Sequence, residues 1–162
     1  MDVTSLAALL VATSLAGGGL LLARWRHRPK SFTIADPLVI DGDTIWHDGQ
    51  KIRLVGIDAP EIDTADGLRA KKHLQGLIAG RPIRVLPRGH DQYGRLLAVL
   101  WTGKGDVCRA MVAAGYAVAS RYETQYARSM REAERAKRGL WRHGPIADPA
   151  AHRRAMQTRQ AA

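Results

Sequence analysis

Residues 39–61 read VIDGDTIWHDGQKIRLVGIDAPE, and the fold is built outward from this stretch. Its apolar residues fall into two short runs, 44–46 and 51–55, on either side of Asp48 and Gly49. An Asp-Gly pair between two such runs is typical of the tight turn of a β-hairpin. The stretch therefore predicts two neighbouring antiparallel strands.

Charged side chains stand at the ends of these runs and inside one of them. Asp43, Asp58 and Glu61 are the acids, and Arg53 lies within the second apolar run. Hard divalent cations such as calcium take oxygen ligands, and a guanidinium holds a phosphate through paired hydrogen bonds. A carboxylate that is not a ligand can activate water as a general base. The pattern indicates a metal ion beside a phosphate.

Three blocks of the chain resemble the signature blocks of the staphylococcal nuclease (thermonuclease) family. They are VIDGDT at 39–44, RLVGIDAPE at 53–61 and DQYGR at 91–95. Their order and spacing match as well, and the resemblance extends over residues 34–141. Three blocks in register are a specific signal, whereas any one of them alone would be weak.

The resemblance implies a calcium-dependent phosphodiesterase with a mainly β, α+β fold, in which a five-stranded OB-type barrel carries about three helices. In that family the positions matching Asp43 and Asp58 give carboxylates to calcium, and the backbone carbonyl at the position of Ala59 is a further ligand. The family often has Thr where this chain has Ala59. Because the carbonyl is kept, we expect this difference to weaken local hydrogen bonding more than metal binding.

Catalytic roles also follow from the resemblance. Glu61 matches the carboxylate that orients or activates water, and Arg53 and Arg95 match the guanidiniums that hold the scissile phosphate. Tyr93 matches a tyrosine near the bound nucleotide, so it is a candidate substrate contact, with packing of a loop aromatic as the alternative. The expected substrates are single-stranded or frayed DNA and RNA, and the expected products end in 3′-phosphate.

Each motif also has a purely structural interpretation. Residues 41–43 can form an ordinary turn, and residues 58–61 can be a loop that opens a helix. The same barrel also serves as a catalytically silent module that binds nucleic acid or protein. All five side chains that the family uses are present: Asp43, Arg53, Asp58, Glu61 and Arg95. This favours the enzyme, because a pure binding module has no need for Glu61.

Residues 3–23 carry no charged side chain and are about long enough to cross a hydrocarbon core of roughly 30 Å. The predicted plan is a hydrophobic anchor at 1–23, a basic linker at 24–33, the nuclease-like domain at 34–141 and a basic, disordered tail at 142–162. A cleaved signal peptide, with a secreted or periplasmic product, is the alternative. Such a peptide begins with a basic region, whereas Asp2 is the only charged residue here.

Basic residues follow the apolar run directly, at Arg24, Arg26, Arg28 and Lys30. Lys and Arg next to a membrane helix are retained on the cytoplasmic side. Relatives of this nuclease are commonly exported, so the side of the membrane stays open. The expected partners are nucleic acid and, through residues 3–23, a membrane; no protein partner is inferred.

Further elements follow from apolar periodicity. Strand residues at 31–36 and 38–40 are interrupted by Pro37, which fits only at an edge or bulge. We expect helices at 68–78, 107–114 and 123–138, a strand at 83–86 that Pro87 stops, and a strand at 96–101. In a regular strand Arg53 and Asp58 would point to opposite faces, so they share a site only if the chain bends near Gly56.

The chain has 25 Lys and Arg against 15 Asp and Glu, a net charge of +10. Such an excess fits an acidic polymer as partner, although part of it lies in the linker and tail. Cys108 is the only cysteine, so no disulfide within the chain is possible, and we expect it to be buried as a small apolar side chain.

Overall fold

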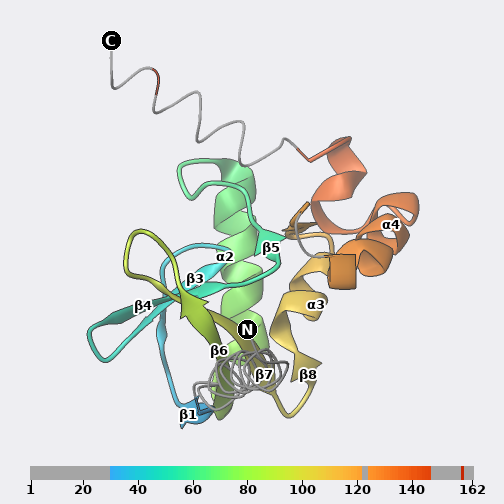
Figure 1. Cartoon of the computed structure of the whole chain (residues 1–162). Helices are drawn as coiled ribbons and strands as arrows, with labels where there is room; N and C mark the ends of the chain where they lie inside the picture. Colours follow the sequence, from blue (N-terminus) through green and yellow to red (C-terminus); the bar gives the residue numbers. More distant parts are fainter. Residues whose placement is uncertain (1–29, 122–123, 147–157, 159–162) are drawn as a thin grey trace, which may run out of the picture.

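The computed structural model describes residues 30–121, 124–146 and 158. Within these residues a curled, mixed β-sheet forms a half-barrel accompanied by three α-helices (Figure 1). The expected OB-like α+β architecture is confirmed at this level. The expected anchor at residues 1–23 lies outside the described residues, and none of the described helices has the length and apolar character that a membrane crossing needs.

The main sheet runs in the order β1-β6-β7-β4-β3-β2, and β8 pairs with β7, which makes seven strands rather than five. Only the β4–β7 pairing is parallel. A second small sheet joins β5 to β9. The strands are β1 (Phe32–Ile34), β2 (Leu38–Val39), β3 (Thr44–His47), β4 (Gln50–Leu54), β5 (Ile57–Asp58), β6 (Ile83–His90), β7 (Leu96–Thr102), β8 (Gly105–Asp106) and β9 (Val118–Ala119).

The β3–β4 hairpin forms as expected. Asp48 and Gly49 both have positive φ, 44° and 80°, which is the backbone of a two-residue hairpin turn that matches the twist of its strands. The expected break at Pro37 is also present, because β1 ends before it and β2 begins after it. Both of these short strands lie at edges of the sheet, where a proline removes no ladder hydrogen bond.

The chain bends between β4 and β5, as the sequence required. Gly56 has φ 82°, a conformation that a side chain disfavours, and it separates the two strands. The bend directs β5 away from the main sheet to pair with β9, so that Asp58 lies opposite Val118. Arg53 and Asp58 therefore no longer follow the alternation of one strand.

The α-helices are α2 (Ala65–Ile78), α3 (Val107–Ala113) and α4 (Ala127–Arg135), and short 3-10 helices cover Thr124–Tyr126 and Gly139–His143. The side chain of Thr64 caps α2 by accepting the N–H of Gly67, so this helix begins three residues earlier than expected. Cys108 is buried, as expected. In place of the single helix expected at 123–138, the described residues form a 3-10 turn followed by the shorter α4.

One predicted strand end was wrong. Pro87 does not stop β6, which continues to His90, because the register against β7 shifts between Pro87 and Gly89. A bulge of this kind accommodates a residue that cannot donate to the ladder. The longer β6–β7 ribbon carries the loop at residues 91–95 out to the end of β4.

Candidate active site

The turn before β3 positions Asp43. The Oδ1 of Asp41 accepts a hydrogen bond from the backbone N–H of Asp43 at 2.9 Å. Gly42 lies between them, and a methyl group on it would come within 2.5 Å of the Cβ of Ala59 and 2.7 Å of the Cβ of Ala70. The turn therefore needs glycine because its backbone packs directly on α2 and on the residue after β5.

The carboxylate of Asp43 is buried and hydrogen-bonded at both oxygens. Its Oδ1 accepts from the hydroxyl of Thr44 at 3.0 Å, and its Oδ2 accepts from the backbone N–H of Ala59 at 3.0 Å. The residue as a whole is 3 % exposed. These bonds hold the group in one orientation, facing the residue that follows β5.

Burial also controls the charge on Asp43. Loss of solvent raises the pKa of this carboxyl from its ordinary 3.8 to about 7; Asp41 and Asp58 add to the rise, while Arg53 and a backbone N–H oppose it. The raised pKa means that burial disfavours the ionised form more than Arg53 and the backbone N–H favour it.

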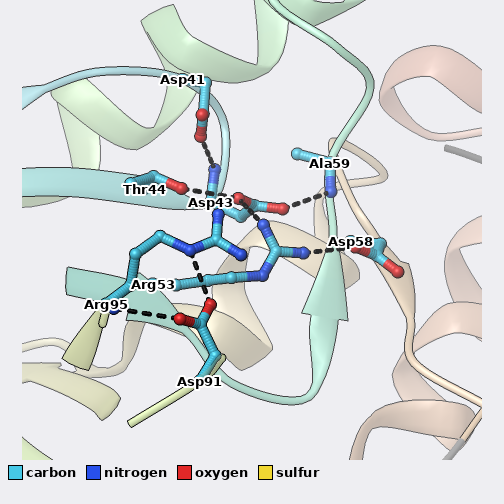
Figure 2. A network of polar contacts seen from close by, with 8 residues as sticks. All are labelled: Asp41, Asp43, Thr44, Arg53, Asp58, Ala59, Asp91 and Arg95. Atoms are coloured by element: carbon cyan, nitrogen blue, oxygen red, sulfur yellow. Dashed lines mark hydrogen bonds and ion pairs between the residues drawn. The ribbon is translucent and has the colours of Figure 1, made fainter. Parts of the chain in front are cut away.

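Arg53 bridges two of the predicted metal ligands (Figure 2). Its Nη1 donates to Oδ1 of Asp43 at 2.5 Å, and its Nη2 donates to Oδ1 of Asp58. The arginine side chain is 18 % exposed and the Asp58 side chain 20 %, so both are largely shielded from solvent. Both carboxylates lie within the span of one guanidinium.

The residues present fit a hard cation. The carboxylates of Asp43 and Asp58 and the backbone carbonyl of Ala59 are all oxygen ligands, the type that calcium prefers, and the N–H of Ala59 already bonds Asp43. Across the described ranges, however, the structure has no cluster of three or more His, Cys, Asp or Glu side chains placed to hold a metal. Any ion here would rely on two carboxylates, a carbonyl and water.

A second acid–arginine pair lies in the loop between β6 and β7. The Oδ1 of Asp91 accepts the backbone N–H groups of Tyr93 and Arg95 at 2.9 and 3.0 Å, and its Oδ2 accepts Nε of Arg95 at 2.7 Å. Desolvation raises the pKa of Asp91, but the bonds from Arg95 and Tyr93 outweigh it and lower the pKa below the ordinary 3.8. Asp91 therefore stays ionised and orients the arginine.

Strand pairing brings this loop to the first network. Arg95 immediately precedes β7, whose Leu96 pairs with Ile52 and whose Leu97 pairs with Arg53. Figure 2 shows both guanidiniums beside Asp43, one reaching in from β4 and the other from the loop. Two arginines from distant parts of the chain thus border one buried carboxylate.

Glu61 lies between β5 and α2 and is partly buried. Its backbone carbonyl accepts the N–H of Thr64 at 3.0 Å and the hydroxyl of Thr64 at 2.7 Å. A methyl group on Gly67 would come within 1.9 Å of the same carbonyl oxygen, so the first turn of α2 packs tightly on Glu61. The helix start thereby sets the backbone position of this acid.

Tyr93 is 69 % exposed and its ring lies 5.5 Å from Cζ of Arg95. It lines an open cavity of about 390 Å³ together with Trp46, Lys51 and Arg95. Most of the residue is exposed to solvent, and the ring contact that the structure shows is with Arg95 of the same loop. The position of Tyr93 fits the predicted substrate contact without testing it.

The predicted residues thus divide into those that the structure joins and those that it places nearby. Asp43, Arg53, Asp58 and Ala59 share one hydrogen-bonded network, and Arg95 borders it. Glu61 and Tyr93 flank the network from the loops next to it. The catalytic and metal-binding roles of all seven stay predictions.

Three supporting side chains were not singled out from the sequence: Asp41, Thr44 and Asp91. All three stand inside the blocks that carry the resemblance. Asp41 and Asp91 could have been predicted, because the side chain of an Asp in a turn often accepts the backbone N–H of the residue two positions later.

Comparisons with known proteins agree with this geometry. A family model described as staphylococcal nuclease homologue matches residues 51–143. An uncharacterized endonuclease from Haemophilus influenzae is 32 % identical over 124 residues, covering 72 % of this chain and 70 % of its own. An uncharacterized endonuclease from Escherichia coli O157:H7 is 40 % identical over 111 residues, covering 64 % of this chain and 72 % of its own.

A further relative carries the name micrococcal nuclease. This Shigella flexneri protein is 33 % identical over 137 residues, covering 74 % of the present chain and 79 % of its own. The family model begins after Asp43 and covers Arg53, Asp58, Glu61 and the loop of Arg95. The chain belongs to the staphylococcal nuclease homologue family.

Proposed function

We propose that this protein is a calcium-dependent phosphodiesterase that hydrolyses DNA, RNA or both and leaves 3′-phosphate ends. The observation that carries the proposal is the bridge that Arg53 makes between the buried Asp43 and Asp58, with Arg95 at its border. In such a group the acids can bind a cation and the arginines can bind the phosphate of a substrate. The family relatives named as nucleases support the same reaction class.

Asp43, Asp58 and the carbonyl of Ala59 are the groups that would hold calcium. When bound, the ion supplies a Lewis acid that polarises the phosphodiester. Arg53 and Arg95 bind non-bridging oxygens of the scissile phosphate and neutralise the charge that grows on them. Asp91 keeps Arg95 aimed at that phosphate through the bond to its Nε.

The reaction is an in-line displacement at phosphorus. Glu61 holds the attacking water and takes one of its protons as the water oxygen bonds to phosphorus. The bond from phosphorus to the 5′ oxygen breaks, and that oxygen leaves with a proton from solvent water. One strand then ends in 3′-phosphate and the other in a 5′-hydroxyl, and no redox step is involved.

The test uses the full chain with end-labelled single-stranded DNA and RNA, in calcium or in excess chelator. Wild type is expected to cut both substrates in calcium and neither in chelator. Glu61→Gln keeps the size of the side chain and removes the base, so its kcat should fall by about 10² to 10⁴ while substrate affinity changes little. Product ends are read by treatment with a 3′-phosphatase.

Glu132→Gln is the matched control, because Glu132 is an exposed acid on α4 that pairs with Arg128. It should cut like wild type. If folded protein binds oligonucleotide yet cuts nothing over a range of pH and metals, the enzyme assignment fails and a silent binding module takes its place.

We also propose that residues 3–23 tether the domain to a membrane, on the grounds of their length and lack of charge. The measurement is carbonate extraction of membranes from cells that express the chain with a C-terminal tag, followed by protease protection to find the side of the domain. Release of the tagged protein by carbonate, with loss of the first residues, would support a cleaved signal peptide instead.

A further inference from the structure

A cavity separate from the network of Asp43 lies between α2 and the segment that follows α3. Its volume is about 460 Å³, and Arg69, Lys72, His73, Gly76, Leu77 and Tyr116 line it. The two helices pack against one another (Figure 1). None of these side chains belongs to the three blocks that carry the family resemblance.

The floor of this α2–α3 pocket is a pair of stacked rings. The rings of His73 and Tyr116 lie 4.3 Å apart between centroids and 21° from parallel. Burial lowers the pKa of His73, so the imidazole is neutral at neutral pH. Its Nε2 has no hydrogen-bond partner within the part of the chain that the structure describes. The contact that the structure shows for this ring is its stacking on Tyr116.

The rim of the pocket is basic. Arg69 and Lys72 are both exposed, one helical turn apart on the same side of α2. Arg69 donates from Nη1 to Oδ1 of Asp66 at 2.6 Å, which uses one of the five N–H groups of the guanidinium. Two cations above a neutral aromatic floor match a nucleotide, whose base stacks and whose phosphate is anionic.

Gly76 lines the pocket and offers a position at which the pocket can be filled by substitution. A glycine inside a helix destabilises it by roughly 1 kcal/mol relative to alanine. Packing does not require glycine here, since a methyl group on Gly76 would meet no atom within 4 Å. Its φ is also not among the positive values in the structure. A larger side chain at position 76 would instead fill the pocket.

The pocket lies next to the proposed site of cleavage. Asp58 pairs with Val118 across β5 and β9, and Tyr116 precedes Val118 by two residues, or roughly 7 Å of extended chain. From the other side, Arg69 follows Gly67, whose backbone packs on Glu61. A strand with its scissile phosphate at Arg53 would therefore extend towards the pocket with nucleotides beyond the two that flank the scissile bond.

We propose that the α2–α3 pocket is a subsite for single-stranded nucleic acid, in which a base beyond the two that flank the scissile bond stacks on the His73–Tyr116 pair and the phosphate next to that base binds Lys72 and Arg69. The inference rests on the proposed nuclease function, because it assigns the pocket to the same substrate. It predicts that longer strands bind more tightly than dinucleotides.

The experiment compares full-length wild type with Gly76→Ala and Gly76→Leu on a dinucleotide and an octanucleotide of single-stranded DNA. Wild type should show a lower KM for the octanucleotide. Gly76→Leu should raise that KM about ten-fold and leave kcat and the dinucleotide KM unchanged, because it removes one stacked base. Gly76→Ala should lie between them, and neither variant should lower the melting temperature.

Gln75→Leu is the matched control, because it adds the same side chain to an exposed position of α2 outside the pocket. Lys72→Gln should reduce the salt dependence of octanucleotide binding by about one phosphate contact, whereas Lys104→Gln, in the exposed turn after β7, should not. An unchanged octanucleotide KM in Gly76→Leu, or an equal rise in Gln75→Leu, overturns the subsite.

Failure of the nuclease assignment has a different signature. If wild type cuts neither substrate, octanucleotide affinity is measured by fluorescence anisotropy in the same variants. A ten-fold loss confined to Gly76→Leu then supports the pocket as a binding site while the enzyme assignment falls. Equal affinity in all variants overturns the pocket as well.

Discussion

Two aspartates in this protein each hold an arginine, and their surroundings shift their pKa values in opposite directions. The Asp43 side chain is 4 % exposed, and burial raises its pKa to about 7 even with Arg53 at 2.5 Å. The Asp91 side chain is 16 % exposed; desolvation again raises its pKa, but its hydrogen bonds with Arg95 and the loop backbone lower the pKa overall.

The difference shows that an ion pair alone does not decide the charge of a carboxylate. Around Asp43 the loss of water outweighs one guanidinium, and two further acids, Asp41 and Asp58, add to the imbalance. Around Asp91 three N–H donors converge on one carboxylate near solvent. Loss of solvent decides the direction of the pKa shift of Asp43, and hydrogen bonds decide that of Asp91.

The largest effect on cleavage is expected for Asp43→Asn. If this carboxylate binds the metal, cleavage in calcium should fall by about 10³, because several kcal/mol of charge stabilisation are lost. Calcium binding, measured by titration calorimetry without substrate, should weaken in parallel. Asp36→Asn, a change at an exposed acid before β2, is the control and should alter neither quantity.

Arg95→Lys is expected to have the next largest effect. Lysine keeps the positive charge but lacks the planar guanidinium, which donates through Nε to Asp91 and leaves its other N–H groups for a phosphate. The kcat should fall by about 10², the usual loss for one donor to a developing oxyanion. Calcium affinity should stay as in wild type, and a large loss of calcium binding would contradict the separation of the two regions.

Asp91→Asn tests whether Asp91 orients Arg95, and its effect should be smaller. The amide oxygen can still accept the two backbone N–H groups, but the NH₂ would face Nε of Arg95 instead of accepting from it. We expect kcat to fall about ten-fold with KM little changed. In a double-mutant cycle with Arg95→Lys, the second change should add little, whereas fully additive losses would mean that Asp91 does not act through Arg95.

The smallest expected effect is a difference in how stability depends on pH. The folded pKa of Asp43 is raised above 3.8, so its contribution is largest below pH 3.8 and is lost as pH rises towards about 7. The pKa of Asp91 is lowered, so its contribution is present above pH 3.8 and is lost only as pH falls below that value.

The measurement is the free energy of unfolding in urea, in chelator, from pH 3 to 8. The difference between wild type and Asp43→Asn should decline from about pH 4 to 7, and the difference between wild type and Asp91→Asn should stay flat over that range. Matching profiles for the two variants would show that burial does not distinguish these carboxylates.

Much of the fold could be predicted because its signals are local. The Asp48-Gly49 turn, the break at Pro37 and the bend near Gly56 all depend on the φ values that a few residues allow. Pro87 was the exception: it reads as a strand end, yet β7 supplies a partner that tolerates a bulge. Whether a proline ends a strand depends on the neighbouring strand as well as on the proline.

The residue types of the candidate site, their order and the family to which they point can all be read from the amino-acid sequence. Which of these residues meet depends on the fold: Gly56 turns Asp58 towards Arg53, the parallel β4–β7 pairing brings in Arg95, and the packing of α2 against the segment after α3 joins His73 to Tyr116. The fold also decides the direction of each pKa shift. The physical reason is that solvent exclusion and long-range pairing depend on atoms far apart in the chain, which no local pattern specifies.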